Sequence, residues 1–209
     1  MSQMQLYRRA GWGSAIVEMQ MAHYGLPVAP VELADLFLDA AARERLMQIS
    51  PAGQIPVLVL PDGKVLSESA AITLYLADLT GRDDLVPGPG AAERADFLRW
   101  LIYLVAQVYP CFTFGDVPSR FLTDPAAQKQ LAEATIARLQ DLWSALEPVA
   151  GGPWFLGARF SALDLYLAAM TNWKPGPEWF QTRAPRLWTI AEAAAARPEI
   201  APVWQQNFA

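Results

Sequence analysis

The sequence predicts an α/β domain with a mixed four-stranded sheet, followed by a domain made only of helices. Strand-like and helix-like segments alternate over residues 1–80, whereas no convincing strand pattern follows residue 90. A stretch rich in Gly, Pro and charge, GRDDLVPGPG at 81–90, is typical of a linker. The predicted domains are therefore residues 1–80 and 91–209, joined by 81–90.

The first domain is predicted to follow the order β-α-β-α-β-β-α. Short apolar or alternating runs predict its strands, and apolar residues at helical spacing predict its helices. In chain order the segments are 4–8, 14–24, 28–34, 40–49, 57–60, 64–67 and 69–81. A helix between the first two strands requires a parallel crossover, whereas the PDG turn at 61–63 makes the last two strands antiparallel.

Helical patterns occupy most of the second domain. They cover residues 91–109, 124–149, 161–172 and 184–196. Pro110 is expected to end or kink the first of these helices, because proline removes a backbone donor and clashes with the preceding turn. Ser161 and Asp164 have the spacing of a capping box, and Phe160 and Leu165 flank it as a hydrophobic staple would. We interpret this pattern as folding chemistry and not as a catalytic motif.

Composition excludes several classes of protein. The chain has 209 residues, of which 53% are hydrophobic and 18% charged, so a packed core is expected and disorder is not. A net charge of -5 does not favour nucleic acid or an anionic membrane as a partner. No apolar run approaches the ~20 residues that span a bilayer, and the N-terminus lacks a signal-like apolar segment. We expect a soluble, cytoplasmic protein.

The single cysteine and single histidine exclude further chemistry. Cys111 has no partner for an intramolecular disulfide, which fits a reducing compartment, and its most plausible role is that of a small buried side chain. His23 stands beside a helix end and is interpreted as a packed residue. No metal site is expected, since one Cys and one His cannot form a Cys/His zinc site. The GWGSAI run at 11–16 lacks the third glycine of a dinucleotide-binding turn, so NAD binding is disfavoured.

A proline directly before the most strand-like run of the chain is the most informative feature. Pro56 precedes VLVL, and a proline belongs at the first residue of a strand or at an edge, because it cannot donate to the sheet. If the Ile55–Pro56 bond is cis, the chain turns sharply there. Ile55 then presents an unpaired N–H and C=O, onto which a short peptide can add as a strand. The alternative is a strand-initiating proline that binds nothing.

Two helix starts supply polar groups near this proline. Glu68 and Ser69 stand where the last predicted strand gives way to a helix, whose free N–H groups attract a carboxylate. The Ser69 hydroxyl and the Glu68 carboxylate extend this to the zwitterionic head of an amino acid, although simple helix capping is the alternative. Ser14 lies at the start of the first helix, where a hydroxyl and helix N–H groups can stabilise a thiolate. No partner base is visible, so a serine hydrolase is disfavoured.

These features occur in the order found in cytosolic glutathione transferases of the two-domain bacterial type. The first 80 residues resemble the thioredoxin-like domain of that family, and the remainder resembles its all-helical domain, so the resemblance covers essentially the whole chain. Its strongest segment is SPAGQIPVLVLPDGKVLSESAAITLYLAD at 50–78, which is similar to the glutathione-binding segment of the family. The SALD run at 161–164 is similar to the family's helix-capping motif.

The resemblance implies roles for several residues. Ile55, ahead of a cis Pro56, would pair through its backbone with the cysteinyl part of glutathione, and Gln54 would lie near the ligand, toward the glycyl end. Glu68 and Ser69 would hold the γ-glutamyl head. By the same resemblance, Ser14 would donate a hydrogen bond to the sulfur.

The thiol-activating group has competing candidates. Some family classes use a tyrosine after the first strand and some bacterial members a cysteine at the first helix; here Arg8 and Gly13 occupy those positions. Tyr7 is one residue out of phase, so its side chain should face elsewhere. Ser14 fits best, with Tyr7, Arg8, the backbone alone or an aromatic of the second domain as alternatives. Six aromatic residues are candidates to line an electrophile pocket: Trp12, Tyr103, Tyr109, Phe112, Phe114 and Trp173.

The predicted function is that of a glutathione transferase, which activates the glutathione thiol for attack on a small hydrophobic electrophile. The resemblance implies glutathione as a cosubstrate, no redox cofactor and a homodimer. One alternative is a non-enzymatic adaptor with the same fold. Another is a glutathione-dependent isomerase, dehalogenase or peroxide reductase, which would share the binding site and differ in the pocket.

Overall fold

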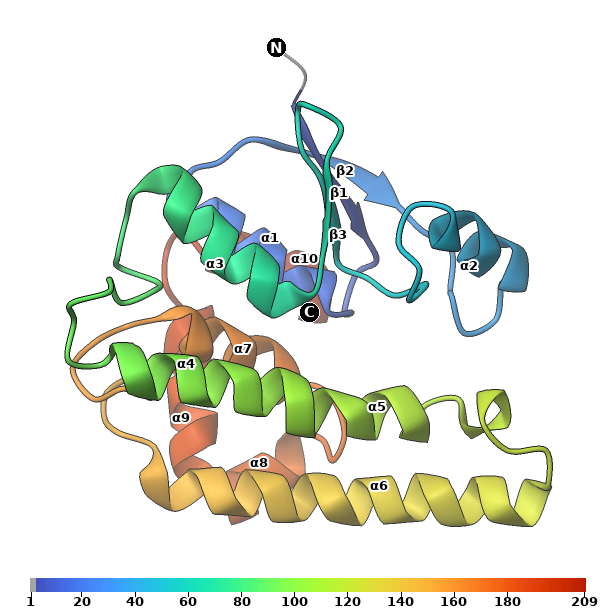
Figure 1. The fold of residues 1–209 in the computed structure, drawn as a ribbon. Helices are drawn as coiled ribbons and strands as arrows, with labels where there is room; N and C mark the ends of the chain where they lie inside the picture. The colour runs from blue at the N-terminus through green and yellow to red at the C-terminus, as the bar shows by residue number, and fades with distance from the viewer. Residues whose placement is uncertain (1–2) are drawn as a thin grey trace. The chain divides into compact units, whose positions relative to one another are not determined.

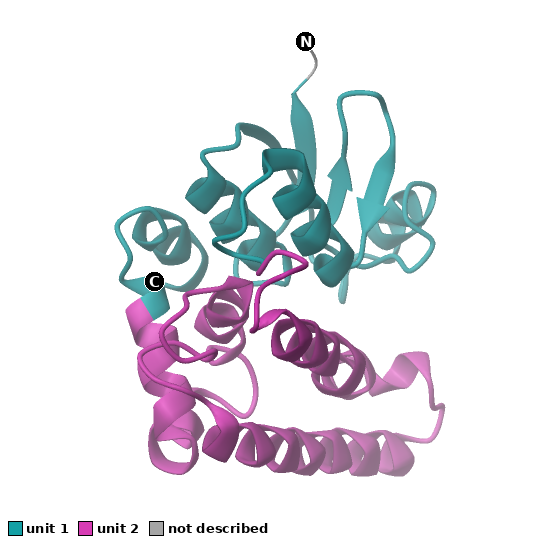
Figure 2. Cartoon of the chain, turned by 60° about the vertical axis from the view of Figure 1, so that its left-hand side comes forward, with its two compact units in different colours: residues 1–86, 194–209 teal, residues 87–193 magenta. Residues whose placement is uncertain are grey.

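The computed structural model describes residues 3–209, which form two compact units (Figure 2). Unit 1 comprises the described residues up to Val86 together with Ala194–Ala209, and unit 2 comprises Pro87–Ala193. The first unit thus contains the C-terminal segment, which the sequence had assigned to the helical domain. The correction has a physical cause, since the last helix of the chain packs on the first.

Unit 1 holds a sheet of four strands in the order β2-β1-β3-β4 (Figure 1). Its elements are β1 (Met4–Arg8), α1 (Ser14–Tyr24), β2 (Val28–Glu32), α2 (Ala40–Met47), β3 (Val57–Val59), β4 (Val65–Ser67), α3 (Ser69–Thr80) and α10 (Ala201–Phe208). β1 pairs with β2 in parallel and with β3 antiparallel, and β3 pairs antiparallel with β4. The predicted order of elements and the mixed sheet are confirmed.

Helices cover both faces of this sheet. α1, α3 and α10 lie on one face and α2 lies on the other (Figure 1). Leu6, Leu58 and Ile72 are fully buried on the side of α1 and α3. Beneath α2, a second cluster is built on Leu36 and Val57. Burial on both faces explains why the VLVL run reads as continuously apolar and not as alternating.

The hairpin between β3 and β4 follows the predicted turn. The backbone N–H of Leu60 donates to the carbonyl of Lys64 over 2.8 Å, and Asp62 Oδ1 accepts from the Lys64 N–H over 3.0 Å. Gly63 has φ of 86°, a left-handed conformation that a glycine adopts without steric cost. The PDG sequence therefore fixes the register that brings the end of β4 beside the start of β3.

His23 forms a structural junction in unit 1. Its Nε2 lies 2.7 Å from Asp84 and its Nδ1 lies 3.2 Å from Glu199. Burial raises the pKa of each carboxyl group, but hydrogen bonds and opposite charges from His23, Arg82 and Arg197 outweigh it, so the net pKa shift is downward. The imidazole thus links α1 to the segment after α3 and to the C-terminal segment, which agrees with its interpretation as a packed residue.

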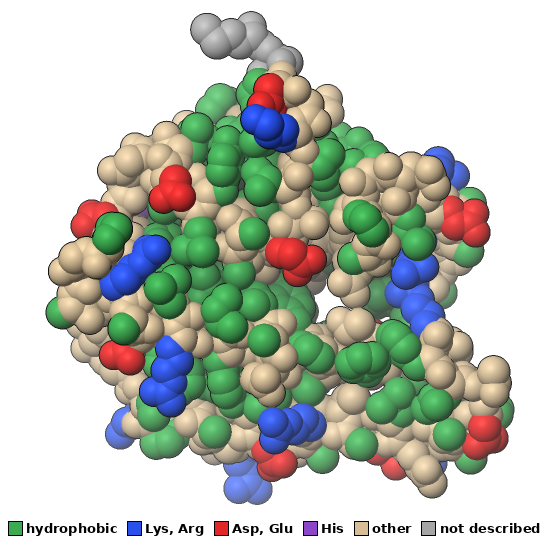
Figure 3. All heavy atoms as spheres, viewed as in Figure 1, with side chains coloured by type: hydrophobic (Ala, Val, Ile, Leu, Met, Phe, Trp, Pro, Cys, Tyr) green, Lys and Arg blue, Asp and Glu red, His purple; other side chains and the backbone are tan. Residues whose placement is uncertain are grey.

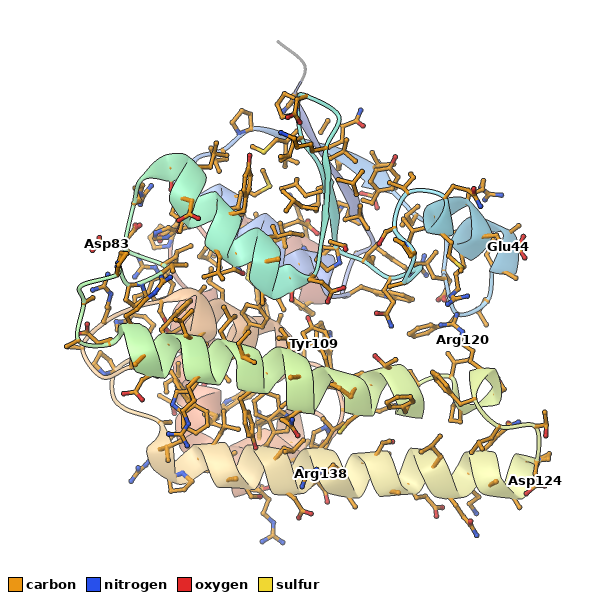
Figure 4. The ribbon with its side chains drawn as sticks, in the orientation of Figure 1. Glu44, Asp83, Tyr109, Arg120, Asp124 and Arg138 are labelled. Carbon is orange, nitrogen blue, oxygen red and sulfur yellow. The ribbon has the colours of Figure 1, made fainter. Side chains whose placement is uncertain are left out.

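Unit 2 is built mainly of helices, and its loop at 154–159 holds two isolated β-bridges. Its elements are α4 (Arg94–Tyr103), η1 (Leu104–Val108), α5 (Tyr109–Gly115), η2 (Pro118–Arg120), α6 (Pro125–Leu146), η3 (Glu147–Val149), α7 (Ala162–Met170), α8 (Pro177–Arg183) and α9 (Pro185–Ala195). α9 ends just past the boundary with unit 1. Asp124, labelled at the start of α6 in Figure 4, accepts from the Ala127 N–H and caps that helix.

The first long helix of unit 2 does not end at Pro110. It continues to Gly115 as α4, η1 and α5, and η1 is a π-helical turn in which the Tyr109 N–H bonds the Leu104 carbonyl. The wider turn directly before the proline changes the local hydrogen-bond ladder, so the missing proline N–H is tolerated. Of the two outcomes predicted for Pro110, an end or a kink of the helix, the first is therefore excluded.

The predicted capping box is confirmed at the start of α7. Asp164 Oδ2 accepts from the Ser161 N–H over 2.7 Å, and Asp164 Oδ1 accepts from the Phe155 N–H over 2.8 Å. Asp164 is fully buried. Its burial raises the pKa of the carboxyl group to about 6, although hydrogen bonds from these donors act in the opposite direction. The carboxylate fastens the preceding loop to α7.

One helix in the described part of the chain, Arg94–Gly115, is long and apolar enough to cross a membrane by length and composition alone. In the structure its segments pack on α6 and α7 within the helical unit. On the face shown in Figure 3 the Lys and Arg side chains are scattered and form no continuous basic patch. By length and composition, the chain contains an apolar helix of span length that the sequence analysis did not expect.

Candidate functional site

Three chain segments meet in unit 1 at the end of the sheet where β1 and β4 finish and β3 begins, which we call the sheet edge. The last paired residues at this edge are Tyr7 with Val57 and Val57 with Ser67. The loop that follows β1, the Ile55–Pro56 segment that precedes β3, and the Glu68–Ser69 segment that follows β4 therefore continue from adjacent strand ends. The sequence had singled out residues in all three segments, and the register is what brings them together.

The Ile55–Pro56 peptide bond is cis, as predicted. Pro56 is buried, and the half-buried Ile55 side chain packs on the cluster around Leu36 and Val57. Across residues 3–209, no hydrogen bond engages the Ile55 N–H or C=O. The side chain is thus anchored while the main chain presents an unused donor and acceptor, which is what strand addition by an extended peptide requires.

Glu68 has an unusual backbone conformation next to this edge. Its φ of 66° makes it the one non-glycine residue of the described chain with positive φ. Such a conformation costs on the order of 1–3 kcal/mol and is concentrated at functional sites. The Glu68 side chain is exposed and forms no ion pair or hydrogen bond within residues 3–209. A strained residue with an unused carboxylate is a feature that folding alone does not explain.

The N-terminus of α3 offers donors beside this carboxylate. No side chain caps the helix, so the N–H groups of its first turn are available to a ligand. Ser69, the first helical residue, is 7% exposed. Behind it, the Gln20 amide donates to Thr73 Oγ1 over 2.9 Å, and Thr73 Oγ1 donates to the Ser69 carbonyl over 2.8 Å. This buried relay from α1 fixes the first turn of α3.

Gln54 lies in the same loop as Ile55 and is exposed. Gly53 before it has φ of 57°, and a Cβ at this position would lie 2.8 Å from the side chain of Met47. The Gly53 N–H donates to the Ser50 carbonyl over 2.9 Å, which closes a tight turn. A glycine is required here by both conformation and space, so the loop holds Gln54 in a defined place.

Ser14 does not have the environment expected of a sulfur donor. The residue is fully buried, its hydroxyl donates to the Arg9 carbonyl over 3.2 Å, and its oxygen accepts from the Arg9 N–H, also over 3.2 Å. Both functions of the hydroxyl are thus used inside the protein. This corrects the sequence prediction, because the pattern placed Ser14 at a helix start but could not show that its side chain turns back to the preceding loop.

The two side-chain alternatives are also engaged elsewhere. Tyr7 packs in the cluster beneath α2, as its strand phase predicted. Arg8 forms an ion pair with Glu18 over 2.8 Å and a second with Glu32. Its hydrogen bonds and charge interactions with these carboxylates outweigh the effect of burial and raise the pKa of the guanidinium. Neither side chain is therefore available at the sheet edge.

The main chain at the start of α1 remains available. No hydrogen bond to the Gly13 N–H occurs within the described residues, and Gly13 is half-buried. No side chain caps α1. Because a helix N-terminus carries partial positive charge, an unused N–H there can stabilise a thiolate. This is the backbone alternative that the sequence had left open.

Three of the six predicted pocket aromatics form one cluster in unit 2. The ring centroids of Tyr109 and Trp173 lie 5.9 Å apart, and those of Phe112 and Trp173 lie 5.4 Å apart. Figure 4 labels Tyr109, which begins α5. Tilted and edge-to-face packing of this kind holds large apolar surfaces in fixed orientations. Half of the predicted lining residues are thus in mutual contact, and their contact with a substrate remains a prediction.

The other three aromatics lie apart from this cluster. Tyr103 packs on Trp100, and its hydroxyl donates to the Leu142 carbonyl over 3.3 Å. Phe114 packs on Phe121, with ring centroids 4.7 Å apart. Trp12 belongs to unit 1 and packs on the ring of Phe37. Their predicted contact with a substrate remains a prediction.

The Cys111 thiol is buried in α5 of unit 2. Burial raises the pKa of the Cys111 thiol, and its Sγ lies 3.6 Å from the Gln107 carbonyl. Among the residues that the structure describes, no three His, Cys, Asp or Glu side chains gather as metal ligands would.

The sequence analysis missed Asn207, whose side chain reaches the loop after β1. Its Oδ1 accepts from the Gly11 N–H over 3.1 Å. The two residues are 196 positions apart, and no local motif marks an asparagine near a C-terminus as part of a site. Only the fold of α10 onto unit 1 reveals the contact.

A mixed sheet with a cis-proline at the start of its third strand, followed by a helical unit, defines a protein of the glutathione transferase fold. The family model described as "Glutathione S-transferase, N-terminal domain" matches residues 14–79. The "Uncharacterized GST-like protein YncG" of Escherichia coli (strain K12) is 36% identical over 204 residues, which cover 97% of this chain and 98% of that protein. The chain belongs to the glutathione S-transferase family.

Solved structures agree with this assignment. A glutathione transferase homologue from Sulfitobacter with bound glutathione superimposes with a TM-score of 0.86 at 24% identity and covers 100% of both chains. A sphingomonad glutathione S-transferase complexed with glutathione has a TM-score of 0.76 at 26% identity and covers 96% of this chain and 97% of that one. The predicted family and fold class are thereby confirmed.

Proposed function

We propose that the protein is a glutathione transferase that binds glutathione along the sheet edge of unit 1 and activates its thiol. The observation that carries the proposal is the unused main chain of Ile55 beside the uncapped N-terminus of α3. The two structural neighbours described above hold glutathione, which supports the same ligand here. Small hydrophobic electrophiles are the proposed second substrates.

Each part of glutathione matches one part of the edge. The cysteinyl unit pairs with the N–H and C=O of Ile55 as an added strand. The γ-glutamyl carboxylate accepts from the first-turn N–H groups of α3 and from the Ser69 hydroxyl, and the γ-glutamyl ammonium meets the Glu68 carboxylate. Gln54 faces the glycyl end. In this arrangement the strain at Glu68 serves to direct its carboxylate toward the ligand.

The thiol is activated by the main chain at the start of α1. A free thiol has a pKa of about 8.5, and lowering it by two units requires about 2.7 kcal/mol. A charge-assisted hydrogen bond from the Gly13 N–H together with the partial charge of the helix terminus supplies roughly that amount. The sulfur then attacks an electrophilic carbon, forms the carbon–sulfur bond and releases the leaving group with the bonding electron pair.

The electrophile is proposed to contact the cluster of Tyr109, Phe112 and Trp173. Apolar faces of this kind remove a hydrophobic molecule from water without demanding specific hydrogen bonds. We further propose a cytoplasmic homodimer, which the family resemblance supports. Size-exclusion chromatography with light scattering measures the oligomeric state.

Binding of glutathione tests the proposal directly. Millimolar glutathione is expected to raise the thermal midpoint of the protein and to give ultraviolet thiolate absorbance at neutral pH, whereas S-methylglutathione gives the stabilisation without the absorbance. A non-enzymatic adaptor shows neither effect. Stabilisation without turnover of an activated nitroaryl chloride would instead favour the isomerase, dehalogenase or reductase alternatives, which use the same ligand.

Ser14→Ala separates a structural hydroxyl from a catalytic one. Because both hydrogen bonds of Ser14 run to Arg9, the variant is expected to lose about 1–2 kcal/mol of stability. Its bound-thiol pKa and kcat should stay within about twofold of the wild type. Ser144→Ala, at an exposed position on α6, is the matched control for stability. Loss of the thiolate absorbance in Ser14→Ala alone would restore the serine to the role first assigned to it.

A further inference from the structure

The C-terminal helix reaches the proposed thiol site from the far end of the chain. α10 packs on α1 within unit 1, on the same face of the sheet (Figure 1). Its last turn places Asn207 against the loop that joins β1 to α1. This loop carries Gly13, the proposed donor to the sulfur. The contact between the helix and the loop was not needed to account for glutathione binding.

Asn207 uses both ends of its amide. Its Oδ1 accepts from the Gly11 N–H over 3.1 Å, while its Nδ2 donates to the Val203 carbonyl over 3.0 Å and lies 3.4 Å from Glu18 Oε2. The side chain is nearly buried, with 9% of the residue exposed. An amide with partners on both sides has one preferred orientation, so its acceptor is directed at the loop.

The loop between β1 and α1 is in close contact with α10. Gly11 has φ of 77°, and a Cβ at this position would lie 3.3 Å from the Asn207 backbone oxygen. The loop and α10 therefore lie so close together that a side chain at this position would be crowded. On the other side of the amide, Glu18 is also bonded to Arg8 at the end of β1. Asn207 thus connects α10 to both ends of the segment that presents the Gly13 N–H.

We propose that Asn207 is a positioning residue for the glutathione thiol, which fixes the β1–α1 loop so that the Gly13 N–H is aimed at the sulfur. The inference rests on the proposed function. Asn207 does not touch glutathione in this arrangement. It acts by holding the donor in place, since a preorganised donor stabilises a developing or resident charge better than one that must be ordered on binding.

Asn207→Ala is expected to raise the pKa of the bound glutathione thiol by about one unit. Below both pKa values this lowers the thiolate fraction, and hence kcat, about tenfold, and the loss should disappear as pH rises above the new pKa. Below both pKa values the dissociation constant for glutathione should change less than about twofold, because the contacts at Ile55, Glu68 and Ser69 are intact. The readouts are the pH profile of thiolate absorbance and the separate values of kcat and KM.

Two further variants define the outcome. Gln206→Ala removes an exposed amide from the same turn of α10 and should leave all three readouts unchanged. Asn207→Gln carries the same amide one methylene farther out and should recover part of the lost thiol acidity. An Asn207→Ala profile that matches the wild type, or a loss that appears equally in Gln206→Ala, overturns the inference.

A measurement without ligand keeps the two proposals distinguishable. Amide hydrogen exchange over residues 9–14 should accelerate in Asn207→Ala and stay unchanged in Gln206→Ala, with no glutathione present. If the wild type shows no thiolate absorbance with glutathione, the proposed function fails, and the role for the thiol fails with it. If the wild type shows the absorbance and Asn207→Ala does not shift its pH profile, the positioning role alone is wrong.

Discussion

Asp164→Ala is expected to lower the free energy of unfolding by about 2–3 kcal/mol at about pH 7.5. The carboxylate accepts from the N–H groups of Phe155 and Ser161, so its removal leaves two buried donors without a partner. For a chain of this size the loss corresponds to about 6–10 °C in thermal midpoint. Urea titration followed by circular dichroism measures it.

The pH dependence of this loss has a defined sign. Burial raises the pKa of Asp164 to about 6 in the folded protein, against about 3.9 in an unfolded chain. Between these values the folded state retains a proton that the unfolded state releases, so the contribution of Asp164 is complete below about pH 4 and declines as pH rises to 6. The difference between wild type and Asp164→Ala should thus be about 1 kcal/mol larger at pH 5 than at pH 7.5.

Asp141→Ala, at an exposed position on α6, is the control for the change of residue type and should shift stability by less than about 0.5 kcal/mol. Equal stabilities of the two variants at every pH would contradict the role assigned to the capping box. A difference that grows with rising pH would contradict the direction of the Asp164 pKa shift.

The sequence was sufficient to predict features that depend on residues close together in the chain. The order of elements in unit 1 follows from apolar periodicity and from the turn at Gly63, and the Ser161–Asp164 box depends on a spacing of three residues. Ile55–Pro56 and Glu68–Ser69 were recognisable because each lies where a strand begins or ends. These signals are local in the chain, so the pattern and the final structure agree.

Features that depend on distant contacts were not accessible in this way. The burial of the Ser14 hydroxyl depends on the path of the loop after β1, and the contact of Asn207 with Gly11 joins opposite ends of the chain. Pro110 was expected to end or kink a helix because a proline always disturbs the local hydrogen bonds, whereas the π-helical turn that lets the helix continue is a property of the packed helix. The short helices α8 and α10 begin around prolines and carry too few periodic residues to be recognised.

Glu68→Gly is expected to make the protein more stable and to weaken glutathione binding. Glycine adopts the φ of 66° without steric strain, so relief of that strain exceeds the added chain entropy and the variant should gain about 1 kcal/mol. The same change removes the carboxylate proposed to meet the γ-glutamyl ammonium. A charge-assisted contact of about 2 kcal/mol corresponds to about a 30-fold loss in affinity. Thermal unfolding and calorimetric titration with glutathione measure the two effects.

A gain in stability together with a loss of glutathione affinity in Glu68→Gly would indicate that the strained backbone of Glu68 serves ligand binding and not folding. Glu68→Gln keeps the strained backbone and removes only the charge, so it should lose affinity without gaining stability. Glu44→Gln, at an exposed position on α2 in the same unit (Figure 4), should change neither quantity. If Glu68→Gly instead loses stability, the glutamate at this position is required by the fold. The ligand role would then fail as the explanation for a positive φ at a non-glycine residue.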